Sequence, residues 1–419
     1  PTDSEVLEEV VVVGIKASLK DAIAIKRSNV GVVEAITAED FGKFPDGNLA
    51  ESLARVVGVG IDRSNVEGER VAVRGFGPEF NLVTLNGRQM PTVPGQYEGG
   101  RSFNFGDIAS PGVSAVEVYK STNSSLPSGG IGSTINMVTT KPLQITGTKK
   151  SFSFNFVEDT TSAEDLGASW RRPIETSFLY ATNQGRMGFS FSGSYQDRDN
   201  REEGTRESNW LVPEDMALIE GYDRVSSSQA GVTNNHGRAD GKTFYQEPSA
   251  YQIKDNKRLR KNAQATFQYE VNENIVTTLD YTYSGVDFQS EGTMFGSWLG
   301  GWDTQQATIN SNGVYTDLVV GNRSYDHQLI WGATKNLNNS IGLNIDWQLN
   351  DDLRVSFDYH DSSSVKVGSE LPNEMGFTTD KKGILIQINA GISGINTFAY
   401  DTAFNAADYY STGMQLWDA

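Results

Sequence analysis

The sequence has no cysteine among its 419 residues, so it can form neither a disulfide framework nor a thiolate metal site. It has only three histidines, His236, His327 and His360, and none stands at an HExxH or zinc-ligand spacing. Basic residues are also outnumbered, since 35 Lys and Arg against 53 Asp and Glu give a net charge of −18. Because such a charge repels phosphate backbones, we expect no nucleic-acid partner.

Two glycine-rich segments lack the residues that would bind phosphate. The segment SGGIGST at 128–134 has no lysine of the GK[ST] type, and GFGPEF at 75–80 has Phe80 where the dinucleotide motif needs glycine. We interpret these glycines as turn and close-packing positions. With neither a metal-ligand spacing nor a phosphate loop, the sequence predicts no enzyme, no resident metal and no cofactor.

Long apolar runs are absent too. No stretch approaches the ~18 apolar residues of a membrane-spanning helix, and the mean hydropathy is −0.42. Such values normally indicate a soluble protein. A transmembrane β-barrel is the exception, because its strands alternate apolar and polar residues and the average stays low. The 43 glycines and the 10% of aromatic residues suit such a barrel.

The first third of the sequence mixes short helical and Val/Ile-rich segments with glycine-bearing turns. Its clearest helix lies within 38–63, where Asp46 or Asn48 is available as the N-terminal cap. Further on, Asn86 and Gly87 are a strong hairpin-turn signal. This part is predicted to be a compact α+β domain.

Beyond residue 150 the apolar residues recur with a period of two, which is typical of β-strands with one apolar face. Phe152, Phe154 and Phe156 share one face, and the same alternation recurs in later segments to give about eight strands. Other apolar positions of this kind are Phe189, Phe191, Ala265, Phe267, Tyr269, Leu279, Tyr281, Leu343, Ile345, Trp347, Val355 and Phe357.

The connections between these strands alternate between short and long. Tight turns are expected at 183–185, 272–274 and 350–352, and long polar loops at 199–257, 289–338 and 362–382. Such alternation is typical of a membrane barrel with one rim toward the periplasm and the other outside. A secreted antiparallel β protein with one polar face is the alternative.

The strand count bears on the length of the whole protein. A barrel of about eight strands is filled by its own side chains, whereas plugged lumens belong to barrels of roughly 22 strands. We therefore expect the front part of a longer chain, which forms a transmembrane antiparallel β-barrel plugged by an N-terminal α+β domain. The barrel would have about 22 strands when complete and about 8 in this segment.

Several segments of the first 142 residues resemble the TonB-dependent outer-membrane receptors. EEVVVVG at 8–14 is similar to the TonB box of that family, and 15–63 is similar to the first half of its plug. VAVRGFGPEFNLVTLNGRQ at 71–89 and the segment 114–142 resemble later plug signatures. RGFGPEFN and GGRSFNFGDIAS resemble the proteobacterial subgroup associated with oligosaccharide uptake. The sequence departs from the family pattern at Val57, where proline is usual, and has no C-terminal aromatic strand.

The resemblance implies three parts: a TonB-box segment at 1–14, a plug domain at 15–145, and the first part of a barrel with long extracellular loops at 146–419. A strand-forming segment that packs into nothing can add to the edge of a partner's sheet. The implied partner is periplasmic TonB of the TonB–ExbB–ExbD system, and the alternative is an internal plug strand. The predicted TonB-box residues are Leu7, Glu8, Glu9, Val10, Val11, Val12 and Val13.

Ligand binding is expected at the plug apex and under the long loops. Aromatic faces and fixed polar groups suit sugars, and the candidate residues are Phe76, Glu79, Gln89, Tyr97, Glu98, Arg101, Phe103, Trp210 and Trp302. Arg74, Arg88 and Glu117 are candidates for plug–barrel ion pairs, because charges inside a wet lumen must pair or stay hydrated. Loop carboxylates suggest Ca²⁺, although no EF-hand spacing supports it.

These expectations predict energy-coupled import of a nutrient, an oligosaccharide by the plug resemblance, across the outer membrane of a Gram-negative bacterium. Outer-membrane lipid and a surface lipoprotein are further expected partners. A ferric-siderophore or haem receptor of the same architecture and a non-transporting adhesin or scaffold are the alternatives.

Overall fold

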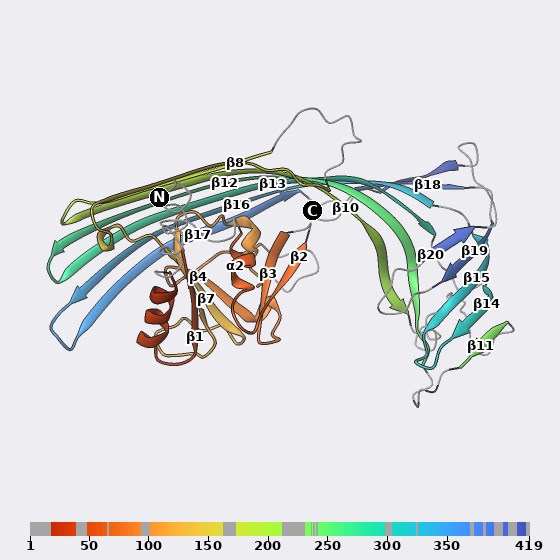
Figure 1. Ribbon diagram of the computed structural model, residues 1–419, viewed down its shortest axis with the longest axis horizontal. Coiled ribbons are helices and arrows are strands. Elements are labelled where there is room, and N and C mark those ends of the chain that lie inside the picture. Colours follow the sequence, from red (N-terminus) through yellow and green to blue (C-terminus); the bar gives the residue numbers. More distant parts are fainter. Residues whose placement is uncertain are drawn as a thin grey trace, which may run out of the picture.

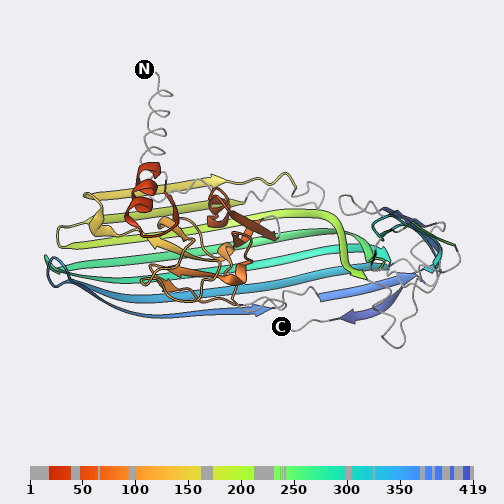
Figure 2. The ribbon, with the colours of Figure 1, turned by 90° about the horizontal axis from the view of Figure 1, so that it is seen from below.

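The computed structural model describes residues 18–38, 48–64, 67–93, 101–161, 173–211, 231–235, 237, 239, 242–297, 304–323, 326–368, 373–379, 383–388, 397–400 and 409–415. One long curved sheet arches over a smaller α+β domain, as two perpendicular views show (Figure 1, Figure 2). No helix within the described residues is long and apolar enough to cross a membrane.

The small domain is built on a five-stranded sheet. Its strand order is β1-β6-β7-β4-β5, with β4 and β7 parallel and the other pairs antiparallel. The strands are β1 (Val33–Thr37), β4 (Asn81–Leu85), β5 (Arg88–Gln89), β6 (Val113–Tyr119) and β7 (Ser133–Thr139). A separate hairpin joins β2 (Val59–Ser64) to β3 (Glu67–Val73), and residues 18–28 are helical.

Helix α2 (Leu49–Leu53) shows how the domain core forms. Asn48 caps it, since its side-chain oxygen accepts from the Ala50 N–H at 2.8 Å and its amide donates to the Gly68 carbonyl at 2.7 Å. The helix is shorter than the 38–63 window because β2 starts at Val59. Leu49 and Leu53 are fully buried in one core with residues such as Val73, Leu85, Phe105, Ile108, Val118, Ile135 and Met137.

Short 3₁₀ helices complete the domain and connect it to the long sheet. They are η1 (Pro78–Phe80), η2 (Phe105–Asp107) and η3 (Pro142–Gln144). Asn183, at the first tight turn of the long sheet, donates to the carbonyls of Leu143 and Ile145 at 2.9 and 3.1 Å. The end of the small domain is thereby fastened to the turn-bearing rim.

The long sheet is antiparallel throughout, with order β21-β18-β16-β13-β12-β10-β9-β8 and β17 beside β16. Its strands are β8 (Thr148–Phe156), β9 (Ile174–Asn183), β10 (Met187–Leu211), β12 (Tyr245–Asn272), β13 (Ile275–Ser297), β16 (Asp326–Gln348), β17 (Arg354–Gly368), β18 (Asn373–Thr379) and β21 (Tyr409–Gln415). Tight turns separate β9 from β10, β12 from β13 and β16 from β17, as the sequence predicts.

The predicted long loops are partly wrong, because strands continue far into them. Strand β10 extends to Leu211, β12 starts at Tyr245 and β13 extends to Ser297. Parts of the same segments form a second sheet in the order β11-β14-β15-β19-β20. Its strands are β11 (Val232–Asn234), β14 (Thr304–Ile309), β15 (Tyr315–Arg323), β19 (Gly383–Ile388) and β20 (Thr397–Tyr400). Ile309 and Tyr315 are fully buried, so this sheet has an apolar core that the period-two pattern did not indicate.

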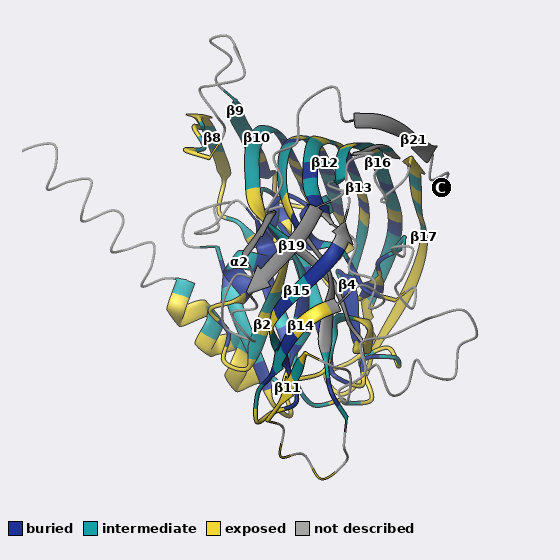
Figure 3. Ribbon diagram, turned by 90° about the vertical axis from the view of Figure 1, so that its right-hand side faces the viewer, coloured by how far each residue is buried: buried dark blue, intermediate teal, exposed yellow. Residues whose placement is uncertain are grey.

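The two faces of the long sheet have the polarity of a membrane barrel. Phe191 and Trp347 are 48% and 45% exposed on the outer face, whereas Ser192 and Thr282 are 2% and 5% exposed on the face toward the small domain. Buried residues alternate with more exposed ones along parts of β10 and β12 (Figure 3). A soluble sheet buries its apolar face, so this inverted pattern favours a wall with hydrocarbon outside and a polar interior. The fold is the front part of a transmembrane antiparallel β-barrel with an N-terminal plug.

Candidate functional site

The plug contacts the barrel wall first at the β4–β5 hairpin. Asn86 and Gly87 have positive φ values of 54° and 82°, which the tight turn requires. The turn directs Arg88 at two barrel carboxylates. Its Nη1 lies 2.7 Å from both oxygens of Asp280, and its Nε and Nη2 lie 2.7 and 3.0 Å from the two oxygens of Asp358.

This cluster holds a buried cation with two anions. Arg88 is 6% exposed. Burial alone would lower the pKa of the Arg88 guanidinium, but the hydrogen bonds that Arg88 donates to Asp358 and Asp280 outweigh it and raise that pKa. The forked guanidinium satisfies both carboxylates at once, which a lysine cannot do.

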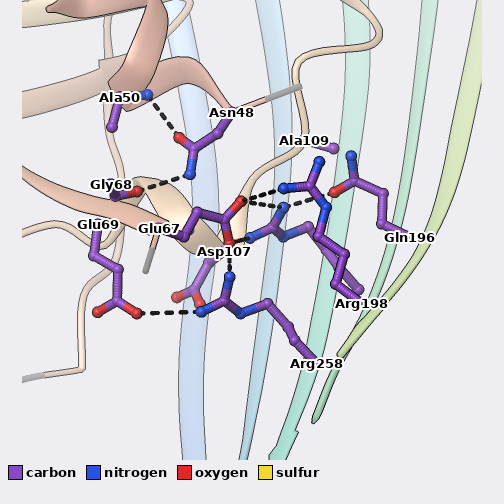
Figure 4. A network of polar contacts seen from close by, with 12 residues as sticks. Asn48, Ala50, Glu67, Gly68, Glu69, Asp107, Ala109, Gln196, Arg198 and Arg258 are labelled. Atoms are coloured by element: carbon purple, nitrogen blue, oxygen red, sulfur yellow. Dashed lines mark hydrogen bonds and ion pairs between the residues drawn. The ribbon is translucent and has the colours of Figure 1, made fainter. Parts of the chain in front are cut away.

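A second plug–barrel cluster lies around Glu67 at the start of β3 (Figure 4). Glu67 Oε2 is 3.0 Å from Arg260 Nη2 and also pairs with Arg258, and its Oε1 is 3.8 Å from Arg198 Nη1. Arg260 is 1% exposed and donates from Nη1 to Gln196 Oε1 at 2.6 Å. Three barrel arginines therefore converge on one plug carboxylate.

Two further plug carboxylates extend this cluster. Glu69 Oε1 is 3.7 Å from Arg258 Nη2, and burial raises the pKa of the Glu69 carboxyl to about 7. Asp107 accepts from the amides of Asn336 and Asn338 at 3.2 and 3.3 Å. Burial also raises the pKa of Asp107, against the opposing effect of those two amides. The plug side of the cluster therefore includes one carboxyl, Glu69, whose pKa lies near neutral pH.

Weaker polar contacts fill the space between the clusters. The Ala109 N–H donates to Asn262 Oδ1 at 3.3 Å, and the Leu143 N–H donates to Gln268 Oε1 at 3.1 Å. The Ser284 hydroxyl donates to the Asp107 carbonyl. The described plug–barrel contacts above are thus hydrogen bonds and ion pairs, in contrast to the apolar core within the plug.

Of the three residues expected to form plug–barrel ion pairs, one contacts the wall and two have partners within the plug. Arg88 reaches the wall, as described. Arg74 instead donates to the Gly132 carbonyl of the plug at 2.6 Å. Glu117 accepts from the Tyr119 hydroxyl at 2.8 Å and from the Asn136 amide at 3.0 Å. For Arg74 and Glu117 the expectation is corrected within the described residues, because their side chains are satisfied inside the plug.

The expected ligand residues fall into different environments. Phe76 is 41% exposed and meets Phe80 edge-on, with ring centroids 6.0 Å apart. Glu79 and Gln89 are exposed, and Arg101 is exposed while donating to the Gly129 carbonyl at 3.3 Å. These four side chains are accessible to a ligand.

Phe103 does not fit the expected ligand role. It is 5% exposed and packs edge-on against Phe105 in the plug core, with centroids 5.1 Å apart. It was expected to bind ligand because it lies in the segment 89–105 among polar and aromatic residues, but both rings lie in the core. We therefore correct this assignment to a core residue.

The side chains of the remaining predicted ligand and TonB-box residues lie outside the part of the chain that the structure describes. Trp210 lies on β10 opposite Gln246, but its side chain is outside the described part. Also outside the described residues are Tyr97, Glu98, Trp302 and the TonB-box residues Leu7, Glu8, Glu9, Val10, Val11, Val12 and Val13. Within the described residues, no group of three or more acidic or histidine side chains is placed to hold a metal ion.

The sequence alone indicates few of the residues that hold the plug and the wall together. Glu67, Glu69 and Asp107 are ordinary charges in a polar domain, and no motif marks them. A signal was present on the barrel side, because Arg258 and Arg260 share the polar face of β12 with Asn262 and Gln264. Charges on an inward face need partners, so they indicate where a plug carboxylate lies.

Comparison with known proteins addresses the plug directly. Residues 25–134 match the family described as TonB-dependent Receptor Plug Domain. The first part of the chain is a TonB-dependent receptor plug domain. The plug match at 25–134 and the wall with its apolar face outward are the arrangement expected of a TonB-dependent outer-membrane receptor. The plug family is a family of receptors rather than of enzymes.

Several solved receptors are similar to this chain at low identity. The siderophore receptor PirA from Acinetobacter baumannii is 13% identical with a TM-score of 0.35, over 87% of this chain and 62% of that one. A mutant of the ferric enterobactin receptor PfeA from Pseudomonas aeruginosa is 12% identical with a TM-score of 0.33, over 88% and 63%. The outer membrane transporter YddB from Escherichia coli is 11% identical with a TM-score of 0.30, over 85% and 55%.

This chain spans between 55% and 63% of the length of those three structures. No curated protein matches the sequence. The case for a TonB-dependent receptor rests on the plug match and on the polarity of the wall.

Proposed function

We propose that the protein imports a nutrient across the outer membrane and that the plug is the gate. The observation that supports this most strongly is the plug at 25–134 against the polar face of a wall whose other face is apolar. A closed lumen of this kind excludes solutes until the plug rearranges. The proposal extends to the whole receptor, of which this chain forms the front part.

The chemistry of the plug–barrel contacts suits a gate. Ion pairs such as Arg88–Asp280 and Glu67–Arg260 hold the plug in one register. Water can replace such contacts when the plug moves, whereas an apolar interface would expose hydrocarbon at full hydrophobic cost. The plug core, by contrast, is apolar and keeps the domain folded.

Energy would enter through the valine-rich segment before the plug. Val10 to Val13 can add as a strand to the sheet edge of periplasmic TonB, with main-chain hydrogen bonds supplying the affinity. The pull would pass to the plug through residues 15–28. We propose TonB of the TonB–ExbB–ExbD system as the partner.

The proposed cargo is an oligosaccharide held above the plug. Phe76 offers an exposed aromatic face, and Glu79, Gln89 and Arg101 offer exposed hydrogen-bonding groups. Sugars are bound by this combination of stacking and fixed polar contacts. Tyr97, Glu98, Trp210 and Trp302 remain part of the proposal, whereas Phe103 does not.

The experiment compares uptake in cells that depend on this receptor. Deleting residues 8–14 should abolish entry of labelled glycan while surface binding persists. A more specific comparison uses two substitutions at Val11. Val11→Pro removes a main-chain hydrogen-bond donor and disfavours strand addition, whereas Val11→Ile keeps the donor and the strand-forming side chain. Uptake should fail in the first variant and persist in the second.

The outcomes separate the alternatives. Uptake that survives both the deletion and Val11→Pro would leave an adhesin or scaffold as the better account. Tight binding of ferric chelates or haem, without glycan binding, would retain the importer and replace the cargo.

A further inference from the structure

The second sheet takes its strands from three separate loops of the long sheet. The first loop joins β10 to β12 and contains β11, the second joins β13 to β16 and contains β14 and β15, and the third joins β18 to β21 and contains β19 and β20. The order in the sheet is β11-β14-β15-β19-β20, so the first loop pairs with the second and the second with the third. Backbone hydrogen bonds thus join three loops that the chain itself leaves independent.

The first loop holds the second on both sides of its hairpin turn. On one side β11 runs parallel to β14, and the Asn235 N–H donates to the Ile309 carbonyl at 3.0 Å. On the other side the Phe244 N–H donates to the Gly313 carbonyl at 2.8 Å, and the Tyr315 N–H donates to the Phe244 carbonyl at 2.9 Å. The tip of the hairpin is therefore enclosed between two stretches of a different loop.

One face of the second sheet forms a shared apolar core. Ile309 on β14 and Leu318 and Val320 on β15 are 0%, 3% and 2% exposed. Tyr315, which pairs with Ile309, is fully buried. The third loop extends this sheet by adding β19 beside β15. Strands that share a core and a hydrogen-bond ladder come apart together, because removal of one exposes apolar surface on its neighbours.

β10 and β12 connect the second sheet to the wall as a two-stranded ribbon. β12 pairs with β13 from Ser249 onward, whereas its pairing with β10 begins at Tyr245, opposite Leu211. Phe244 is the preceding residue and already pairs with Val314 in the β14–β15 turn. The ribbon bends away from the wall toward the second sheet (Figure 1). It is a direct link about which that sheet can move.

The second sheet lies over the lumen at the long-loop end. Figure 1 shows it at the opposite end of the long sheet from the tight turns, on the same side of that sheet as the plug. Figure 3 looks along the strands from this end, and β14, β15 and β19 lie in front of β2 and β4 of the plug. A solute that approaches from the long-loop end therefore meets the second sheet before the plug.

We propose that the second sheet is an outer gate above the plug and that its three loops open together as one body. The proposal rests on the proposed import function, because a gate has a purpose only if a solute passes. Opening one loop at a time would break the backbone bonds of Phe244 or uncover the core around Tyr315. Rotation of the whole sheet on the β10–β12 ribbon keeps all of these contacts. The receptor then has two barriers in series, the outer gate first and the plug second.

The unity of the gate is tested by hydrogen exchange of the purified receptor in detergent. The three loops are followed through peptides that cover 231–235, 304–323 and 383–388. Tyr315→Ala removes a fully buried ring from the second loop and should speed exchange in all three peptides about a hundredfold, or to the unprotected rate if that is reached first. The wall strands β12 and β13 should keep their protection, which shows that the variant is folded.

The matched control for this variant is Gln306→Ala, an exposed position on the same sheet, which should leave exchange unchanged in all three peptides. Faster exchange of Tyr315→Ala in 304–323 alone would show that the loops are independent, and the proposal would be wrong. Equal acceleration in the control would refute the role of the shared core.

Coverage of the lumen is tested by chemical labelling of the plug. The sequence has no cysteine, so Ile131→Cys, at a plug position that is 69% exposed, supplies a single reactive thiol. In intact cells a bulky polymer-linked maleimide should label this thiol slowly, and Tyr315→Ala should remove the delay. A small maleimide should label both backgrounds alike. A bulky reagent that labels both backgrounds equally fast would contradict the gate.

Movement as one body is tested by a disulfide between two loops. Val319 and Ile386 are paired residues of the second and third loops. The Cα atoms of such antiparallel pairs are about 4.5–5.5 Å apart, within disulfide reach. Val319→Cys with Ile386→Cys should therefore tie the loops on oxidation without changing the rate at which the bulky reagent labels Ile131→Cys.

Slower labelling after oxidation would mean that the loops must separate to open the lumen, and would overturn the one-body gate. The reduced form of the same variant is the control. None of these measurements depends on uptake, so a failure of the gate proposal is distinct from a failure of the import proposal.

Discussion

Arg88 of the plug and Asp280 of strand β13 are 192 residues apart in the chain, yet Nη1 of the arginine lies 2.7 Å from each oxygen of the carboxylate. The hairpin that carries Arg88 has only two residues on its second strand, and its turn is also hydrogen-bonded to β7 through Asn86 and Gly87. The contact shows how the plug is registered in the barrel. Local turn chemistry aims the cation, and the wall supplies the anion.

Replacing Arg88 by alanine should destabilise the closed receptor by about 3–5 kcal/mol, since it leaves a buried carboxylate without a partner. Arg88→Lys should recover part of this, because it restores the charge but not the fork. Urea-induced unfolding of the purified protein measures the loss, and entry of an antibiotic too large for intact outer membranes reports plug loosening. An unchanged unfolding midpoint in Arg88→Ala would contradict the role of this pair.

Glu67 and Arg260 should behave as one unit in a double-mutant cycle. Each single variant, Glu67→Gln or Arg260→Met, leaves the other residue of the pair buried without its charged partner. Each single substitution should therefore lower the free energy of unfolding substantially. The double variant should cost less than the sum by roughly 0.5–3 kcal/mol. Additive losses, measured by the same unfolding assay, would mean that Arg258 and Arg198 hold Glu67 without Arg260.

Stability should depend on pH through Glu69. Burial raises its pKa from 4.5 to about 7, so the folded state binds a proton more tightly than the unfolded state. The contribution of Glu69 to the free energy of unfolding should therefore be greatest below about pH 4.5 and should fall as the pH rises through about 7. The total change in this contribution is ~3 kcal/mol. In Glu69→Gln this part of the pH dependence should vanish.

The measurement is the unfolding midpoint of wild type and Glu69→Gln from pH 5 to pH 8. Asp107→Asn is the control for the neighbouring carboxylate, whose pKa burial also raises. Parallel curves for wild type and Glu69→Gln would show that Glu69 does not titrate in this range.

Phe103 and Phe76 should respond oppositely to truncation. Phe103→Ala creates a cavity in the plug core and should cost about 3–5 kcal/mol. Phe76→Ala removes an exposed ring and should change stability by less than about 0.5 kcal/mol, while it weakens glycan binding. Equal stability losses in the two variants would place Phe76 in the core as well.

The polarity of the wall gives a test of membrane insertion. Leu279→Arg places a charge in the middle of the outer apolar surface and should cost ~2–4 kcal/mol when the receptor folds into lipid vesicles. Tyr251→Arg is the matched control, because Tyr251 is on the same face but beyond that surface, at 37% exposure. In a soluble sheet both substitutions at such exposed positions would be nearly neutral.

The parts of the fold that follow from local patterns could be predicted from sequence. Period two places Phe191, Phe267 and Trp347 on one face, and Asn-rich turns locate the hairpins. The long-loop ends of the strands could not be predicted, because polar residues such as Asp199, Gln289 and Glu291 occupy many outer positions there, so the alternation weakens while pairing continues. The second sheet around Tyr315 was missed for a related reason, because its short strands depend on long-range pairing.

The candidate site was harder to predict for a different physical reason. An ion pair such as Glu67 with Arg260 joins residues that only the fold brings together, and either charge alone is compatible with a solvated surface. Asn86 and Gly87 fix the turn before Arg88, so its direction had a local cause. The prediction for Phe103 was wrong because an aromatic residue in a loop segment can equally pack into the core, and composition alone does not distinguish the two.

The order of strands in the plug also sets its mechanical response. Among the described residues, β1 is the first strand and lies at one edge of its sheet, where it pairs with β6 alone. A load transmitted from the residues before Ser18 therefore reaches the strand with a single neighbour. Detachment of β1 would remove the edge strand of the plug sheet. The C-terminal end of the plug would stay attached to the barrel rim through Asn183. Such a load is therefore expected to open the plug from its β1 edge first.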